Sequence, residues 1–467
     1  MPRSPPHDRG TGQNLLRPPA LLFTRPTDAP PVRVLMLGWE FPPHISGGLG
    51  TACLGITRGL AHHGVEVTLV LPRAFGDEPT DSARIVGCSL ADTQGGDGPS
   101  PDALIRILGV DSALSPYLDE ATYRERVRAF ARRPASPPET AATSDAARRV
   151  TVAGGAPTLG GLYGPNLLAE VARYADVVRE LSTRETFDVI HAHDWMTYPA
   201  GIAAAKASGK PLVAHVHASE FDRCGEHGNP AIVALERRGL AAADRVVCVS
   251  HYTADVVARR YRVPRHKIRV VHNAILPGEA PPPRAPRRSL DEAVVLFLGR
   301  VTYQKGPAYF LEAAAKVVKV LPRARFVIAG SGDLLPSIVE RTASLGLARH
   351  VRFTGFLSGG DVERMYRAAD VYVMPSVSEP FGIAPLEAMA LDVPVIVTRK
   401  SGVAEVLKSA LKVDFGDVAD LADKIVAVLT RPALRASLVA EGRRELAEMR
   451  WERRAERLIG VYEEAAA

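Results

Sequence analysis

Two arrays of short β-branched runs, each alternating with helical patterns, constrain the fold of this chain more than any other feature. The strand candidates of the first array are 32–39, 65–71, 188–193, 211–217, 245–250 and 267–273, and those of the second are 293–300, 324–330, 351–355, 371–376 and 393–399. Such alternation is typical of parallel sheets that are covered by helices on both faces. The sequence therefore predicts an α/β chain with two Rossmann-like domains, whose parallel sheets face a central cleft.

Composition along the chain sets the predicted boundaries. Residues 1–30 are rich in proline and are expected to form a disordered leader. From about 76 to 164 the strand pattern gives way to Ala, Pro, Gly, Asp and Arg, so we expect a long insertion with little regular structure, except for a helix at 121–133. Between the arrays, the run LPGEAPPPRAPRRSL excludes a helix and indicates a linker. The predicted units are 31–275, the linker 276–292, 293–448 and a last helix within 449–467.

Overall composition excludes several classes of protein. With 46% hydrophobic and 24% charged residues, the chain is typical of a globular protein. The formal net charge of +6 is small for 467 residues and does not predict nucleic-acid binding, although a basic cleft suits an anionic ligand such as a nucleotide diphosphate. No apolar run approaches the length of a transmembrane segment. The four cysteines have no paired spacing, which favours a reducing cytoplasm over a disulfide framework.

A glycine-rich loop, SGGLG at 46–50, follows the first predicted strand and precedes a helical pattern at 51–63. Paired glycines allow a ligand to approach the backbone, and the N-terminus of the following helix offers unpaired N–H groups. This arrangement suits a phosphate group. The spacing differs from the G-x-G-x-x-G fingerprint of dinucleotide-binding proteins, and an ordinary tight turn is the alternative.

Two pairs of histidines stand at the ends of predicted strands. His191 and His193 precede Asp194, and His215 and His217 end the next strand. Alternate residues of a strand share a face, so each pair is expected to project together. Two such pairs with a nearby carboxylate have the composition of a metal site. Hydrogen-bonded packing at the strand ends is the alternative.

Charged residues follow two strands of the second array. Arg300 and Lys305 lie in the run GRVTYQKG, where a guanidinium fork and an ammonium group are suited to clamp a diphosphate. Fixed cations there would stabilise the negative charge that develops as the diphosphate leaves. Glu379 and Glu387 lie in the run SEPFGIAPLE, and their carboxylates are suited to accept hydrogen bonds from sugar hydroxyls. Solvated surface charges and a helix cap are the respective alternatives.

These motifs resemble those of the retaining glycosyltransferases classed as family 4 and of their relatives, the bacterial and archaeal glycogen synthases. GRVTYQKG, AGSGD and SEPFGIAPLE occur in the order of that family, and the opening WEFPPHISGGLG is similar to a glycogen-synthase-like branch. The resemblance spans nearly the whole chain outside the leader and the insertion. It implies the GT-B fold, with an acceptor-side N-terminal domain, a nucleotide-sugar donor domain and a last helix that packs back on the N-terminal domain.

The resemblance also implies a role for each phosphate-binding motif. Gly47, Gly48 and Leu49 would face the donor diphosphate. Arg300 and Lys305 would hold its phosphates and stabilise the leaving group.

The sugar and the ribose are assigned to the SEPFGIAPLE run. Glu379 would contact the transferred sugar, together with the backbone of Phe381, Gly382 and Ile383. Glu387 would accept the ribose hydroxyls.

Further positions follow from the same resemblance. His217 is similar to the histidine near the anomeric centre of glycogen synthases, and Gly330, Ser331 and Gly332 would form another close-approach loop near the nucleotide. Contacts with the acceptor are expected from Glu40, His193 and Asp194.

The activity implied is metal-independent transfer with retention of configuration, with no cofactor besides the nucleotide-sugar co-substrate. Its partners would be that donor and a glycan acceptor, and the expectation is glucose from an ADP or UDP donor onto an α-glucan. Thr51, however, stands where glycogen synthases carry an acidic residue, and the 76–164 insertion has no counterpart. Two alternatives remain, a metal-dependent hydrolase built on the His191/His193 and His215/His217 pairs, and a non-catalytic nucleotide-sugar-binding scaffold.

Overall fold

The computed structural model describes residues 32–43, 48–72, 74, 78–79, 83–86, 105–109, 167–276 and 293–467, with only the backbone given for 83–86 and 105–109. Four predicted features lie outside these residues, namely the leader at 1–30, the helix at 121–133, Gly47 and all of the linker except Leu276.

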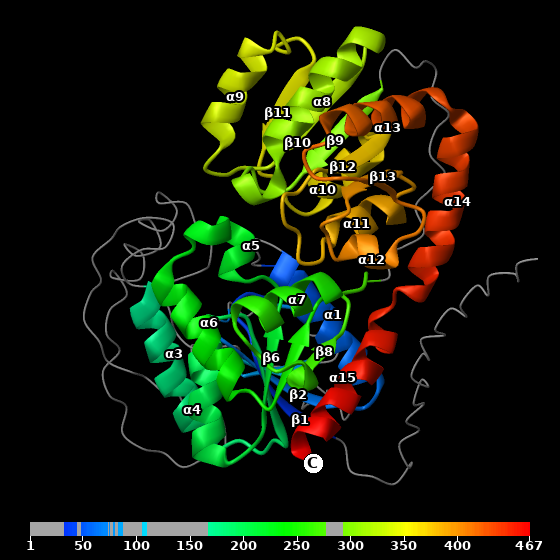
Figure 1. Cartoon of the computed structure of the whole chain (residues 1–467). Coiled ribbons are helices and arrows are strands. Elements are labelled where there is room, and N and C mark those ends of the chain that lie inside the picture. The colour runs from blue at the N-terminus through cyan, green and yellow to red at the C-terminus, as the bar shows by residue number, and fades with distance from the viewer. Residues whose placement is uncertain are drawn as a thin grey trace, which may run out of the picture. The chain divides into compact units, whose positions relative to one another are not determined.

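The N-terminal domain contains a parallel sheet of eight strands in the order β3-β4-β2-β1-β5-β6-β7-β8. Alternate residues of β1 are buried on opposite faces. Leu35 and Leu37 lie among helices α3 (Leu167–Ser182), α4 (Tyr198–Ser208) and α6 (Pro230–Ala242), and Met36 lies between helices α1 (Gly48–His62) and α15 (Trp451–Ala466). Burial on both faces explains the continuous apolar runs of these strands (Figure 1). The elements are β1 Arg33–Leu37, α1 Gly48–His62, β2 Glu66–Leu71, β3 Ala83–Val86, β4 Ile105–Gly109, α3 Leu167–Ser182, β5 Val189–His193, α4 Tyr198–Ser208, β6 Leu212–Val216, α5 Glu220–Cys224, η1 Gly225–His227, α6 Pro230–Ala242, β7 Arg245–Cys248, α7 His251–Arg260, η2 Arg265–Lys267 and β8 Ile268–Val270.

The C-terminal domain contains a parallel sheet of six strands in the order β11-β10-β9-β12-β13-β14. This is the doubly wound order, in which the chain starts in the middle of the sheet and winds first to one edge and then to the other. The elements are β9 Val294–Leu298, η4 Tyr303–Lys305, α8 Pro307–Val320, β10 Arg325–Ala329, α9 Leu335–Ser344, β11 Val351–Gly355, α10 Gly360–Ala368, β12 Val371–Met374, α11 Ala384–Ala390, β13 Val395–Thr398, α12 Val403–Val406, β14 Leu411–Val413, α13 Val418–Thr430, α14 Pro432–Glu448 and α15 Trp451–Ala466.

Three strands were not anticipated from the sequence. The strands β3 and β4 lie within the 76–164 stretch, so the expectation of little regular structure there was wrong at these two places. Strand β4 pairs with β2, with Val67 opposite Ile105, and extends the edge of the sheet. Strand β14 pairs with β13 at the other sheet's edge. All three are three to five residues long, too short to show a strand period by themselves.

The last helix, α15, packs against α1 of the N-terminal domain (Figure 1). Two glycines of α1 permit this close contact, because a Cβ at Gly55 would lie 2.1 Å from the indole of Trp451 and one at Gly59 would lie 2.6 Å from the Trp451 carbonyl oxygen. Just before α15, Ile275 forms a parallel β-bridge with Arg450, and the Ile275 N–H donates to the Met449 carbonyl at 3.2 Å. The residue that ends the N-terminal domain and the residues just before α15 therefore lie side by side.

Among the described helices, none has both the length and the apolar character that crossing a bilayer requires.

Candidate functional site

The C-terminal half of the site lies where the strand order reverses. Strand β9 is adjacent to β12, although β10 and β11 separate them in the chain. Lys305, which ends η4 after β9, therefore meets Glu379, which follows β12, and Lys305 Nζ lies 2.6 Å from Glu379 Oε2. The hydroxyl of Ser376 donates to the same oxygen at 3.1 Å. Two residues that the sequence assigned to separate motifs thus form one ion pair at the position where such sheets bind ligands.

Arg300 and the predicted 330–332 loop are neighbours. Half-buried Arg300 follows β9, and the N–H of the next residue, Val301, donates to the Ser331 carbonyl at 2.9 Å. A Cβ at Gly330 would lie 1.9 Å from the Gly299 oxygen, and one at Gly332 would lie 2.3 Å from the Val301 oxygen. These glycines are therefore required for the approach of one loop backbone to another. Exposed Ser331 lies at the surface of the same loop.

The SEPFGIAPLE run forms a turn followed by α11. Phe381 is buried. Gly382 has a φ of 96°, and a Cβ at this position would lie 3.1 Å from the Glu379 side chain, so both the backbone conformation and the space favour glycine. Glu387 lies in the first turn of α11 and accepts a hydrogen bond from the Tyr366 hydroxyl at 3.0 Å. Burial raises the pKa of Glu387. Its predicted contact with a ribose remains a prediction.

The glycine-rich loop leads into α1, which begins at Gly48, three residues before the predicted helical pattern. Buried Glu40 accepts a hydrogen bond from the Gly50 N–H at 3.1 Å, and its carboxylate thus stabilises the positive end of α1. A Cβ at Gly48 would lie 3.8 Å from the Ile383 side chain. The structure therefore places the described part of this loop, Gly48 and Leu49, next to the SEPFGIAPLE run.

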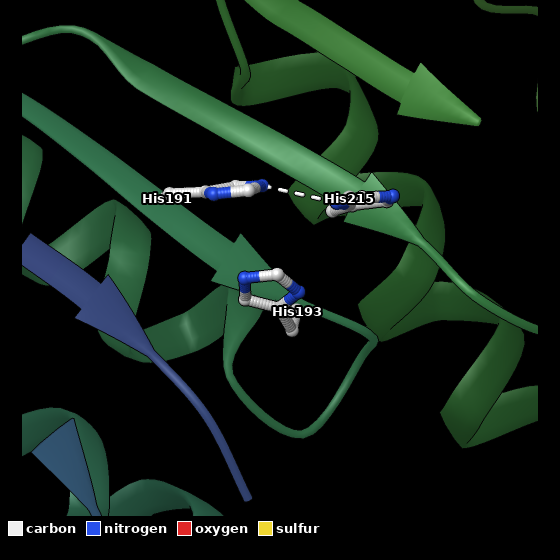
Figure 2. Close-up of side chains that lie close together, drawn as sticks. All are labelled: His191, His193 and His215. Carbon is white, nitrogen blue, oxygen red and sulfur yellow. Dashed lines mark hydrogen bonds between the residues drawn. The ribbon is translucent and has the colours of Figure 1, made fainter. Parts of the chain in front are cut away.

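The four strand-end histidines form two hydrogen-bonded pairs. His191 Nε2 lies 3.1 Å from His215 Nδ1, which Figure 2 shows, and His193 Nδ1 lies 2.9 Å from His217 Nε2. The hydroxyl of Tyr462, on α15, lies 2.8 Å from the remaining nitrogen of His191. Burial lowers the pKa of His191 and of His217 to about 3, and it lowers the pKa of His193 and of His215 far below the ordinary value. All four imidazoles are therefore neutral near pH 7.

This geometry favours hydrogen-bonded packing over the hydrolase alternative. Nitrogen atoms of His191, His193 and His215 lie within 4.8 Å of one another, which is within reach of a metal ion. Both nitrogens of His191 already have partners, however, and the three residues are 0%, 0% and 1% exposed. A catalytic metal needs an open position for water and substrate, which such burial does not provide. Only His217 is partly exposed, and it is the member of the cluster that is placed to meet a ligand.

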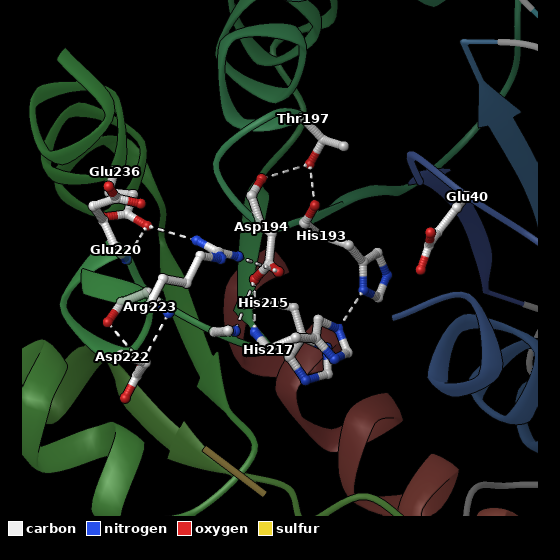
Figure 3. A network of polar contacts seen from close by, with 12 residues as sticks. Glu40, His193, Asp194, Thr197, His215, His217, Glu220, Asp222, Arg223 and Glu236 are labelled. Atoms are coloured by element: carbon white, nitrogen blue, oxygen red, sulfur yellow. Dashed lines mark hydrogen bonds and ion pairs between the residues drawn. The ribbon is translucent and has the colours of Figure 1, made fainter. Parts of the chain in front are cut away.

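Asp194 holds the loop that carries His217 (Figure 3). Its Oδ1 accepts the backbone N–H of His217 at 2.7 Å and that of Ala218 at 3.3 Å. Asp194 has a φ of 60°, a left-handed conformation that aspartate adopts more readily than most residues. Burial raises the pKa of Asp194 to about 6. Since His193 and Asp194 are buried and both contact His217, the structure places them behind this residue.

Sequence reasoning missed the residues that join the two halves. The Ser378 hydroxyl donates to Asp222 at 2.8 Å and lies 2.9 Å from the Tyr252 hydroxyl. The Thr253 hydroxyl donates to the Pro380 carbonyl at 3.3 Å. Asp222, Tyr252 and Thr253 all lie just after predicted strands of the first array. Their place after a strand end could have identified them as candidates from the sequence.

A second contact between the domains involves Glu405 of α12. Its carboxylate accepts the N–H groups of His251 and Tyr252, at 2.9 and 2.7 Å, and lies 2.9 Å from His272 Nε2. Burial alone would raise the pKa of Glu405, but the hydrogen bonds from His272 and the two amides outweigh it and lower the pKa. The carboxylate thus stabilises the N-terminus of α7 from the other domain.

We expect Glu405→Ala to lower the free energy of unfolding by about 0.5–2 kcal/mol at about pH 7, because the first turn of α7 loses its acceptor. The Glu405 pKa is lowered in the folded chain, so its contribution is present above the ordinary value of 4.5 and disappears as the pH falls through the folded pKa. Urea unfolding at about pH 7 and about pH 3 measures this. Glu441→Ala, on an exposed part of α14, is the control. A difference that persists unchanged at the lower pH would contradict the assignment.

Three family models match the chain, and two curated relatives are similar to it over most of its length. Residues 283–445 match the family model "Glycosyl transferases group 1", residues 112–277 match "Glycosyltransferase Family 4", and residues 33–94 match "Starch synthase catalytic domain". An uncharacterised glycosyltransferase of Methanocaldococcus jannaschii is 31% identical over 392 residues, which are 81% of this chain and 83% of that protein. The glycogen synthase of Mycobacterium tuberculosis is 27% identical over 445 residues, 92% of this chain and 94% of that protein.

The fold has close structural counterparts as well. The catalytic domain of starch synthase IV from Arabidopsis thaliana, solved with ADP and acarbose, superposes with a TM-score of 0.64 over 94% of this chain and 100% of that one, at 15% identity. The predicted fold class, two Rossmann-like domains of the GT-B type, is confirmed. The 31% sequence identity with the Methanocaldococcus jannaschii glycosyltransferase extends over most of both proteins. We therefore conclude that this chain belongs to the family 4 glycosyltransferases, has their GT-B fold and resembles the glycogen synthases.

Proposed function

We propose that this glycosyltransferase moves glucose from ADP-glucose or UDP-glucose to an α-glucan, with retention of configuration and without a metal ion. The observation that carries the proposal is the Lys305–Glu379 ion pair at the reversal of strand order, at 2.6 Å. It combines a cation for a leaving diphosphate with a carboxylate for a sugar hydroxyl at the carboxyl edge of a doubly wound sheet. The match to a starch synthase model at 33–94 and the likeness to a glycogen synthase support the choice of donor and acceptor.

In the proposed reaction, an acceptor hydroxyl attacks the anomeric carbon from the side on which the diphosphate leaves. The bond from the anomeric carbon to the phosphate oxygen breaks, the bond to the acceptor oxygen forms, and the acceptor proton passes to the departing phosphate. Arg300 and Lys305 stabilise the charge that develops on the diphosphate. Burial lowers the pKa of His217 to about 3, so its imidazole is neutral. It forms hydrogen bonds with the sugar and does not serve as an acid.

A thermal-shift screen tests the proposal. The protein, freed of metal and kept in EDTA, is heated with ADP, UDP, GDP and their glucose conjugates, because a ligand that binds the native state raises the unfolding midpoint. A shift with one nucleotide identifies the donor, and transfer of labelled glucose from its conjugate to glycogen then identifies the reaction. No shift with any nucleotide, together with stoichiometric metal in untreated protein, would favour the histidine-centred hydrolase. A shift without transfer to any glycan would favour the scaffold.

We expect Glu387→Ala to weaken donor binding by about 10-fold to 100-fold, because a charged acceptor for the ribose hydroxyls is lost. Turnover at saturating donor changes much less, since the ribose is remote from the breaking bond. Isothermal titration calorimetry with ADP and UDP measures the affinity. Glu340→Ala, on an exposed part of α9, serves as the control. Wild-type affinity in folded Glu387→Ala would remove this residue from the donor site.

A further inference from the structure

A buried charged network lies behind the loop that carries His217 (Figure 3). Arg223, on α5, lies between two carboxylates, with Nη2 3.5 Å from Asp194 Oδ2 and Nη1 3.8 Å from Glu236 Oε1. The exposed fractions of the three side chains are 7%, 4% and 4%. A buried guanidinium between two buried carboxyl groups loses its hydration, so the ionisation of each carboxyl group is linked to the Arg223 cation.

The Glu236 end of the network is fixed by three elements. Glu236, on α6, accepts the N–H of Glu220, at the start of α5, at 2.9 Å. Its other oxygen accepts a hydrogen bond from the hydroxyl of Tyr261, the C-cap of α7. These bonds tie α5, α6 and the end of α7 together, and they set the position of the residue that anchors the Arg223 guanidinium.

The Asp194 end of the network leads to His217. One oxygen of Asp194 faces Arg223, and the other accepts the backbone N–H groups of His217 and Ala218. Asp194 keeps a left-handed backbone, at a φ of 60°, which must be stabilised by its surroundings. The chain of contacts therefore runs from Glu236 through Arg223 and Asp194 to the backbone of His217.

We propose that Arg223, anchored by Glu236, is a positioning residue for His217 and acts through the Asp194 carboxylate on the loop that follows β6. This inference rests on the proposed function. Neither residue reaches a substrate, because both are buried behind Asp194. A buried ion pair adds little to stability in comparison with apolar packing, so its effect is expected in the geometry of the loop.

A pH signature separates this role from a purely structural one. Burial raises the pKa of Asp194 to about 6, and the Arg223 cation opposes that rise. Three titratable groups near Asp194 have pKa values that burial raises and the Asp194 charge raises further, namely Glu236 of α6, to about 7, Tyr198 of α4 and Cys53 of α1. If turnover requires the ionised Asp194, kcat falls on the acid side, and removal of Arg223 moves that fall to higher pH.

The test compares Arg223→Met, Arg223→Lys, Asp194→Asn and the double variant Arg223→Met/Asp194→Asn, with Arg237→Met on an exposed part of α6 as the matched control. We expect Arg223→Met to lower kcat for glucose transfer by about 10-fold to 100-fold, with the donor KM within about 2-fold, because the loop moves while the proposed contacts with the diphosphate and the ribose stay. In this variant the fall of kcat on the acid side of its pH profile moves to higher pH. Arg223→Lys recovers most of the turnover, and the double variant is no slower than the slower single variant.

The same set of proteins distinguishes failure of the inference from failure of the proposed function. If the wild type transfers no sugar, the proposed function fails, and histidine-selective NMR still tests the network, because the His217 signals then shift in Arg223→Met and not in Arg237→Met. Folded Arg223→Met with wild-type kcat, acid limb and His217 signals would overturn the inference. If Arg223→Met does not fold, Arg223→Lys and Asp194→Asn decide by the same readouts.

Discussion

Lys305→Ala is expected to lower kcat by about two to three orders of magnitude, because a fixed cation that faces a developing oxyanion is lost. The half-buried ammonium has a short ion pair with Glu379, at 2.6 Å, so its position is set before any ligand binds. A preorganised charge of this kind costs no reorganisation during the reaction, which is why its removal affects turnover more than affinity.

The Lys305→Ala substitution also lowers stability, and a further variant separates this effect from the loss of turnover. Removing the lysine leaves buried Glu379 with the hydrogen bond from the Ser376 hydroxyl but without its ammonium partner, and a buried carboxylate without a cation is itself unfavourable. Lys305→Ala/Glu379→Gln relieves that penalty without restoring the cation. We therefore expect it to regain folding stability and not turnover.

Single-turnover and steady-state kinetics with the donor identified by thermal shift measure both effects. Lys319→Ala, on an exposed part of α8, is the matched control and is expected to behave as the wild type. A folded Lys305→Ala protein with unchanged kcat would show that this ammonium takes no part in the reaction.

Trp451→Ala is expected to lower the free energy of unfolding by about 3–5 kcal/mol, the usual cost of deleting a large buried aromatic side chain. The indole lies between α1 and α15, is 3% exposed and occupies the space that the missing side chain of Gly55 leaves. Its removal creates a cavity at the contact that attaches the last helix to the N-terminal domain. Urea unfolding followed by far-UV circular dichroism measures the change.

Two companion variants and a control test whether the lost stability comes from the packing of Trp451 against Gly55. Gly55→Ala in the wild type places a methyl group 2.1 Å from the indole and destabilises the contact by overpacking. In the Trp451→Ala background the same methyl group fills part of the cavity and is tolerated. Arg457→Ala, on the exposed side of α15, changes stability by less than about 0.5 kcal/mol. Stability of Trp451→Ala equal to that of Arg457→Ala would show that α15 is not held by this side chain.

Much of the fold could be predicted because burial on both faces leaves a clear pattern. β1, β9 and β12, for example, are continuous apolar runs that end in glycine or polar residues, and each prediction was confirmed within a few residues at its ends. β3 and β4 carry the same signal over only four or five residues in a long polar stretch, and their identity as strands depends on the neighbour with which they pair.

The site was predictable residue by residue, but its pairings were not. Lys305 and Glu379 each follow a strand, which marks them in the sequence, yet their contact depends on the order of strands in the sheet. Arg223 and Glu236 carry no such mark, because a charged residue in a short helical pattern is usually on a solvated face. Only the burial of both side chains distinguishes them, and burial is a property of the folded chain.

The paired connections at Ile275 and Arg450 also restrict how the two domains can move. The β-bridge and the hydrogen bond from the Ile275 N–H to the Met449 carbonyl hold the two places at which the chain passes between the domains next to each other. We therefore expect any opening between the domains to pivot near this pair, so that the segments farthest from it separate the most.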